Sequence, residues 1–79
     1  MTQEQIDKHF TTLFNLYPST NVMVYEDSLV FYKIPYGQNN RVQDELNALI
    51  MEHNLPLVAK SNESGNGLFA DTVFVEVKK

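Results

Sequence analysis

The sequence predicts an α+β domain in which two helices cover one face of a four-stranded antiparallel sheet. Two segments carry apolar residues at helical spacing. Each is followed by a proline and then by segments rich in β-branched and aromatic residues, which are typical of strands. The expected order is helix, strand, strand, helix, strand, strand within a single domain, residues 1–79. The pattern leaves the strand order open.

The first helix is expected to begin after Thr2 and to end before Pro18. Thr2 and Gln5 have the spacing of a capping box, and the residue before a proline is driven out of helical geometry. The apolar face of this helix is predicted to consist of Ile6, Phe10, Leu13, Phe14 and Tyr17.

A β-hairpin is expected next, with strands at 21–25 and 28–34 and a tight turn at Glu26 and Asp27. Because this turn contains no glycine, the sequence does not define its register.

The second helix follows a loop at 35–40. Asn40 is expected to cap its start together with Gln43. Asn54 is expected to end it in left-handed geometry, and Pro56 prevents its continuation. Its buried face is predicted to consist of Val42, Leu46, Leu49, Ile50 and His53.

The last two strands are predicted at 57–60 and 68–77, joined by the loop 61–67, SNESGNG. A phosphate-binding loop delivers its backbone amides at the start of a helix, whereas this loop leads into a strand. Asn66-Gly67 is a hairpin signal, since both residues tolerate positive φ. We therefore expect a plain turn; the alternative is a loop that contacts a ligand or partner.

Composition argues against several kinds of chemistry. Six basic and ten acidic side chains give a net charge of −4, and the bases are too scattered for a nucleic-acid surface. No cysteine is present, and His9 and His53 lie in no pattern that binds metal. The serines match no nucleophile motif. We expect a protein that is not an enzyme and needs no cofactor or metal.

One face of the predicted sheet carries more apolar side chains than the fold requires. Alternate residues of a strand point to opposite sides, and a sheet covered on one side needs only one apolar face. Both sides of the predicted strands are apolar here. The residues left over, which form the main candidate surface for binding a partner, are Met23, Tyr25, Val30, Tyr32 and Phe74. The opposite parity, or scattered apolar residues without function, are the alternatives.

A second candidate is the loop from residue 36 to residue 41, with Tyr36, Asn39 and Arg41 as its binding residues. It precedes a helix N-terminus and carries an arginine, a combination suited to an anion or a partner carboxylate. The alternative is a loop in which Asn40 only caps the helix.

These observations favour a small acidic protein-interaction module that docks on another protein. A phage or mobile-element inhibitor of a host factor is one example. We expect it to self-associate through the open sheet face or an edge strand. One alternative is a regulatory domain with a small-ligand pocket near Tyr36, Arg41 and His53. Another is a nucleic-acid binder that stacks bases on Tyr25, Tyr32 and Lys33.

We expect a cytoplasmic location. No apolar run reaches the length of a membrane span, and the first residues, MTQEQIDKHF, lack the basic start and apolar stretch of a signal peptide.

Overall fold

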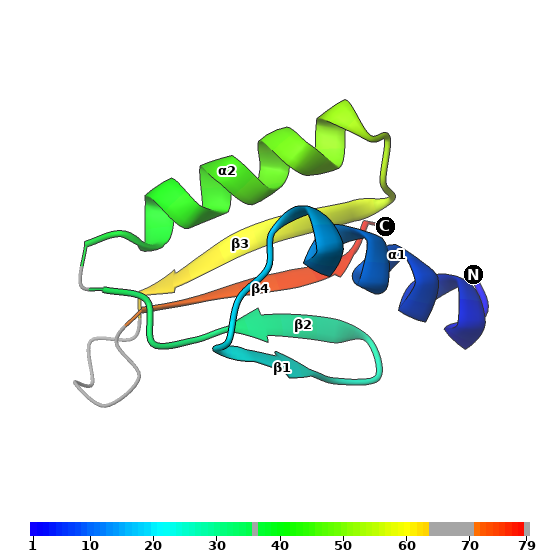
Figure 1. Cartoon of the computed structure of the whole chain (residues 1–79), viewed down its shortest axis with the longest axis horizontal. Coiled ribbons are helices and arrows are strands. Elements are labelled where there is room, and N and C mark those ends of the chain that lie inside the picture. The colour runs from blue at the N-terminus through cyan, green and yellow to red at the C-terminus, as the bar shows by residue number, and fades with distance from the viewer. Residues whose placement is uncertain (36, 64–70, 79) are drawn as a thin grey trace.

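The computed structural model describes residues 1–35, 37–63 and 71–78, with the backbone alone at 62, 63 and 71. Over these residues, two helices and four antiparallel strands follow in the predicted order, so the expected α+β class is confirmed (Figure 1). The elements in chain order are α1 (Gln3–Leu16), β1 (Val22–Val24), β2 (Ser28–Phe31), α2 (Asn39–Glu52), β3 (Leu57–Glu63) and β4 (Asp71–Val77).

The strand order, which the sequence leaves open, is β1-β2-β4-β3. Strand β4 pairs antiparallel with both β2 and β3, so β2 and β3 run in the same direction with β4 between them. Helix α2 connects these two parallel strands. Strands β1 and β3 are therefore the two edges of the sheet.

The core lies between the helices and one side of the sheet. In the central pair, Leu29 faces Val75 and Phe31 faces Val73, and all four side chains are buried. Because residues paired across a sheet point to the same side, this side is the one that the helices cover. The other buried members of the core are Phe10 and Leu13 from α1, Leu46 and Ile50 from α2, and Leu57 and Ala59 from β3.

Both ends of α1 follow the sequence prediction. The Thr2 hydroxyl accepts the Gln5 amide at 3.2 Å, and the Gln5 side chain accepts the Thr2 amide at 3.0 Å, which completes the capping box. The helix ends at Leu16, and the amide of its cap residue Tyr17 donates to the Leu13 carbonyl. The Tyr17 ring then packs edge-on against Phe31, with 5.9 Å between ring centroids, and so ties the end of α1 to the sheet.

The predicted start of α2 is wrong. The helix begins at Asn39, and its cap residue Gln38 makes no side-chain capping bond. The two residues expected to form the capping pair bond to β3 instead. Asn40 Oδ1 accepts the Ser61 hydroxyl at 2.9 Å, and Gln43 Oε1 accepts the Ser61 amide at 2.6 Å. The predicted left-handed geometry at Asn54 is confirmed by its φ of 52°.

Side chains of α2 form hydrogen bonds with the backbone groups at the outer edge of β3. The bond from the Lys78 amide to the Pro56 carbonyl places Pro56 in a hydrogen-bonded pair. The backbone groups of Leu57, Ala59 and Ser61 consequently point away from β4. The Asn47 side chain accepts the Ala59 amide at 2.9 Å and donates to the Ala59 carbonyl at 3.0 Å. Figure 1 shows α2 running alongside β3.

Several strand lengths differ from the prediction. Strand β1 is Val22–Val24 rather than 21–25, and β2 ends at Phe31 rather than 34. Lys33 adopts a φ of 55°, a left-handed geometry that ends the extended chain.

Strand β3 continues to Glu63 rather than ending at 60, so the first three residues of the predicted 61–67 loop are strand. The remaining loop residues, 64–67, and the predicted strand residues 68–70 lie outside the described residues.

Replacing Asn47 by alanine is expected to lower the free energy of unfolding by about 1 to 3 kcal/mol. It removes two hydrogen bonds to the β3 edge and leaves the Ala59 amide and carbonyl without those partners. The measurement is urea denaturation.

The matched control is Asn15→Ala in α1, since Asn15 is exposed and alanine favours the helix. An equal effect of the two substitutions on stability would contradict the role assigned to Asn47.

Candidate functional site

The side of the sheet opposite the helices brings the predicted surface residues together. Met23 pairs with Val30, and Val30 pairs with Phe74, so these three side chains form one row across β1, β2 and β4. Tyr25 and Tyr32 extend the row at the ends of β1 and β2. We call this set of five residues the open face.

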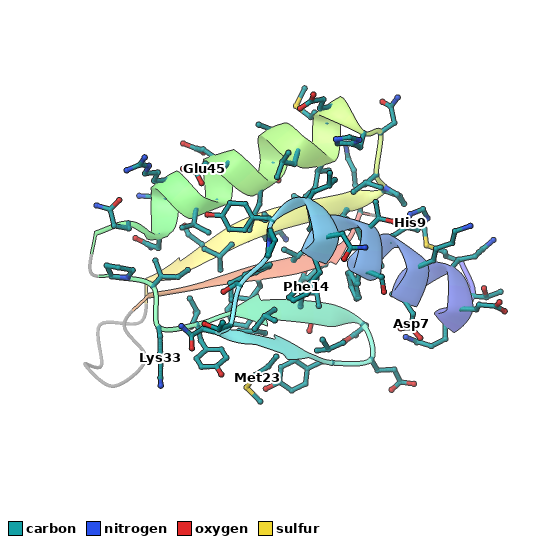
Figure 2. The ribbon with its side chains drawn as sticks, viewed as in Figure 1. Asp7, His9, Phe14, Met23, Lys33 and Glu45 are labelled. Carbon is teal, nitrogen blue, oxygen red and sulfur yellow. The ribbon has the colours of Figure 1, made fainter. Side chains whose placement is uncertain are left out.

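The members of the open face differ in exposure. Met23 and Tyr25 are each 48% exposed, whereas Val30 is only 9% exposed; Tyr32 and Phe74 are half-buried. The Tyr25 hydroxyl donates to the Met23 sulfur at 3.7 Å. Figure 2 shows Met23 pointing away from both helices. The accessible apolar part of the open face is therefore concentrated at β1.

Two polar residues, Lys60 and Glu76, form the border of this apolar row on the side of β3. Lys60 pairs with Phe74 in the register, and its Nζ lies 3.8 Å from Glu76 Oε2. Both side chains are exposed, so this ion pair stabilises the fold little. It marks where the apolar surface ends.

The helix side of β1 is also exposed. Val24 pairs with Leu29 and so points toward the covered side, but it is 68% exposed. Val22 and Val24 line a groove of about 440 Å³ with Phe10, Thr11 and Phe14 of α1. We call it the α1–β1 groove. Figure 2 shows Phe14 between α1 and the sheet.

One end of the α1–β1 groove lies beside the turn that contains Glu26 and Asp27. Asp7 lines the groove, and Gln3 Nε2 donates both to Asp7 Oδ1, at 2.9 Å, and to the Glu26 carbonyl. These bonds hold Asp7 close to the turn formed by Glu26 and Asp27. Among the described side chains, the ion pairs are Arg41–Glu45 and Lys60–Glu76. Asp7, Glu26 and Asp27 take part in neither of them.

The structure describes two of the three residues of the second predicted site at 36–41, Asn39 and Arg41. Asn39 is buried, with 3% of its surface exposed, and its Nδ2 has no hydrogen-bond partner in the described structure. Arg41 is exposed and binds Glu45 instead, with 3.1 Å between Nε and Oε1. Tyr36 lies outside the described residues. Asn39 and Arg41 therefore lie in different surroundings, one buried and the other exposed.

The prediction that His53 lies on the buried face of α2 is wrong, because its side chain is exposed. It follows the last turn of the helix as its C-terminal cap residue. It lies twelve positions after Arg41, which corresponds to about 18 Å at the helical rise. The two residues therefore do not line one pocket.

The described residues also limit other kinds of site. They bring together no group of three histidine, aspartate or glutamate side chains placed to hold a metal ion. Within the same residues, neither helix has the length and apolar character needed to cross a membrane.

Comparisons of the chain with models of protein families, with curated proteins and with solved structures found no match.

Sequence reasoning identified the open face and missed the α1–β1 groove. The helical spacing of Phe14 predicts that it faces the sheet, and the alternation along the strand places Val22 and Val24 on the side opposite Met23. That assignment is right for the direction of the side chains. Exposure depends in addition on β1 being an edge strand, and the sequence gives no signal for strand order.

A small polar network between the end of α1 and α2 predicts a pH dependence of stability. The Tyr17 hydroxyl donates to Glu45 Oε2 at 2.9 Å. Partial burial and the adjacent Glu45 carboxylate raise the pKa of Tyr17 above its ordinary value of 10.0, against a smaller opposing effect of Arg41. The folded state therefore favours the neutral phenol, and its contribution to stability is present below about pH 10 and lost as the pH rises further.

We expect Tyr17→Phe to lose less stability than the parent between about pH 8 and about pH 11, as measured by urea denaturation. Tyr25→Phe removes a hydroxyl from the open face and is the matched control; it is expected to follow the parent. If Tyr17→Phe and the parent lose stability equally over this range, the role of Tyr17 is disproved.

Proposed function

We propose that this chain is a non-catalytic protein-interaction module that docks on another protein through the open face. The observation that carries the proposal is the exposure of two large apolar side chains on this face, Met23 and Tyr25, each of which is 48% exposed. Clusters of this kind on a small domain are typical of binding surfaces. Methionine and tyrosine are also enriched at interfaces between proteins.

The character of the open face supports docking. The half-buried Phe74 and Tyr32 share this side of the sheet with the exposed Met23 and Tyr25, and Val30 lies between Met23 and Phe74. A partner would therefore meet an apolar row across three strands. The Lys60–Glu76 pair lies beside this row and offers a polar rim. An apolar centre with a polar rim is the usual arrangement of such interfaces.

Docking alone is enough for an inhibitor or a regulatory subunit, because occupying a target surface requires no reaction. A phage or mobile-element inhibitor, as considered from the sequence, is one form that this function takes. The ligand-binding alternative loses its expected site, since Arg41 and His53 lie at opposite ends of α2.

Site-specific photo-crosslinking tests the proposal. A benzoylphenylalanine residue at position 25 is expected to give a discrete adduct with a partner protein in cells that naturally produce the chain. The same residue at position 51 is the control, since Met51 is 78% exposed but belongs to α2. Mass spectrometry then identifies the adduct.

Adducts that form equally at both positions, or at neither, would contradict docking through the open face. An adduct that contains two copies of the chain and nothing else would replace the partner protein by a homodimer.

A further inference from the structure

The two edges of the sheet differ in how their backbone groups are satisfied. At β3, side chains of α2 bond to the outward groups of Ala59 and Ser61. At β1, the Tyr25 amide donates to the Ser28 carbonyl at 2.8 Å, and the Tyr32 amide donates to the Asn21 carbonyl at 3.0 Å. These bonds place the hydrogen-bonded pairs at odd positions of β1, so the N–H and C=O groups of Val22 and Val24 point outward.

No hydrogen bond within the described residues reaches these outward groups of Val22 and Val24. The strand is only three residues long, but Val22–Val24 contains no charged residue and no proline that would oppose pairing. An extended chain placed beside β1 would gain backbone hydrogen bonds and continue the sheet.

The α1–β1 groove defines which side chains such an added strand would carry. Residues directly opposite Val22 and Val24 would point to the same side of the sheet as these valines. That side opens into the groove lined by Phe10, Thr11 and Phe14. Two apolar side chains, separated by one residue, would therefore enter the groove.

Charge at the groove favours a basic residue before the apolar pair. An added antiparallel strand begins beside the end of β1, near Asp7 of the groove and near the turn that contains Glu26 and Asp27. None of these acids belongs to an ion pair of the described residues. A lysine or arginine two residues before the first apolar residue would lie opposite Glu26, on the side of the sheet that faces Asp7.

We propose that the edge of β1 binds an extended basic-apolar peptide segment of a partner protein, which adds to the sheet as an antiparallel fifth strand. The segment carries one or two basic residues followed by alternating apolar residues. This inference does not depend on docking through the open face, because Val22 and Val24 point to the opposite side of the sheet from Met23.

A second copy of the chain fits the edge less well. Symmetric pairing of two β1 strands, with Val22 opposite the partner's Val24, would place the uncharged Thr20 beside Glu26. The acidic end of the groove would stay without cations, and two molecules of net charge −4 would be brought together.

The test uses the purified full chain and the synthetic peptide RKTVTVT, followed by nuclear magnetic resonance titration of the backbone amides. We expect saturable shifts at Val22 and Val24, and about fivefold weaker binding of EETVTVT at low salt. Two methylated forms of RKTVTVT examine the backbone directly. Methylation of the first valine nitrogen removes a bond to β1 and is expected to weaken binding about fivefold. Methylation of the threonine nitrogen between the valines, which points to solvent, is expected to leave binding unchanged.

Two variants of the protein, matched in strand and in the residue introduced, separate the faces of β1. Val24→Lys places a cation in the groove and is expected to abolish peptide binding. Met23→Lys places the same cation on the open face and is expected to retain it. Circular dichroism establishes that both variants are folded, which is expected because both side chains are exposed.

The absence of saturable shifts in the parent would overturn the proposal. Equal binding of the two methylated peptides would show apolar contact without strand addition, and would overturn it too. Light scattering tests whether a second copy of the chain occupies the edge instead. A parent dimer that Val24→Lys converts to a monomer would assign the edge to a second copy instead of a peptide.

Discussion

Where β2 pairs with β4, two rows of side chains leave the sheet in opposite directions. One row includes the fully buried Leu29 and Val75, which the helices cover; the other includes Val30 and Phe74. A shift of this pairing by one residue on either strand would exchange the two faces of that strand. The same pairing sets the alternation of hydrogen bonds through the whole sheet, and so decides which backbone groups point outward at each edge. The core, the open face and both edges depend on this single register.

The two helices present different kinds of side chain to the two edges of the sheet. Helix α2 presents amide side chains to β3, so that Asn47 and Gln43 satisfy outward backbone groups within the fold. Helix α1 presents Phe14 and Asp7 to β1, and neither offers β1 the paired donor and acceptor that Asn47 offers β3. One half of the molecule is consequently closed by its own side chains. The other half keeps apolar surface, backbone hydrogen-bonding groups and negative charge together at one strand.

Whether a structural feature could be predicted from the sequence depends on how far apart in the chain the interacting residues lie. Both helices and the parity of the strands could be predicted, because capping residues and side-chain alternation act within a few positions. The strand order could not, since β2 meets β4 across about forty residues of chain and no local pattern encodes that contact. The same limit explains the misplaced cap at Asn40: the spacing with Gln43 is right for a capping pair, but Ser61 competes for both side chains. It also explains why the open face was predicted and the exposure of Val24 was not.

Because the edge of β1 is exposed, the net charge of −4 also opposes association between molecules of the protein. An edge with outward N–H and C=O groups can pair with the same edge of another molecule, and the side chains from Val22 to Tyr25 put no charge in its way. Repulsion between whole molecules then keeps them apart. As the carboxylates are neutralised toward the isoelectric point, this repulsion vanishes while the edge is unchanged. The colloidal behaviour of the protein is therefore governed by pH through its surface, independently of how strongly the chain is folded.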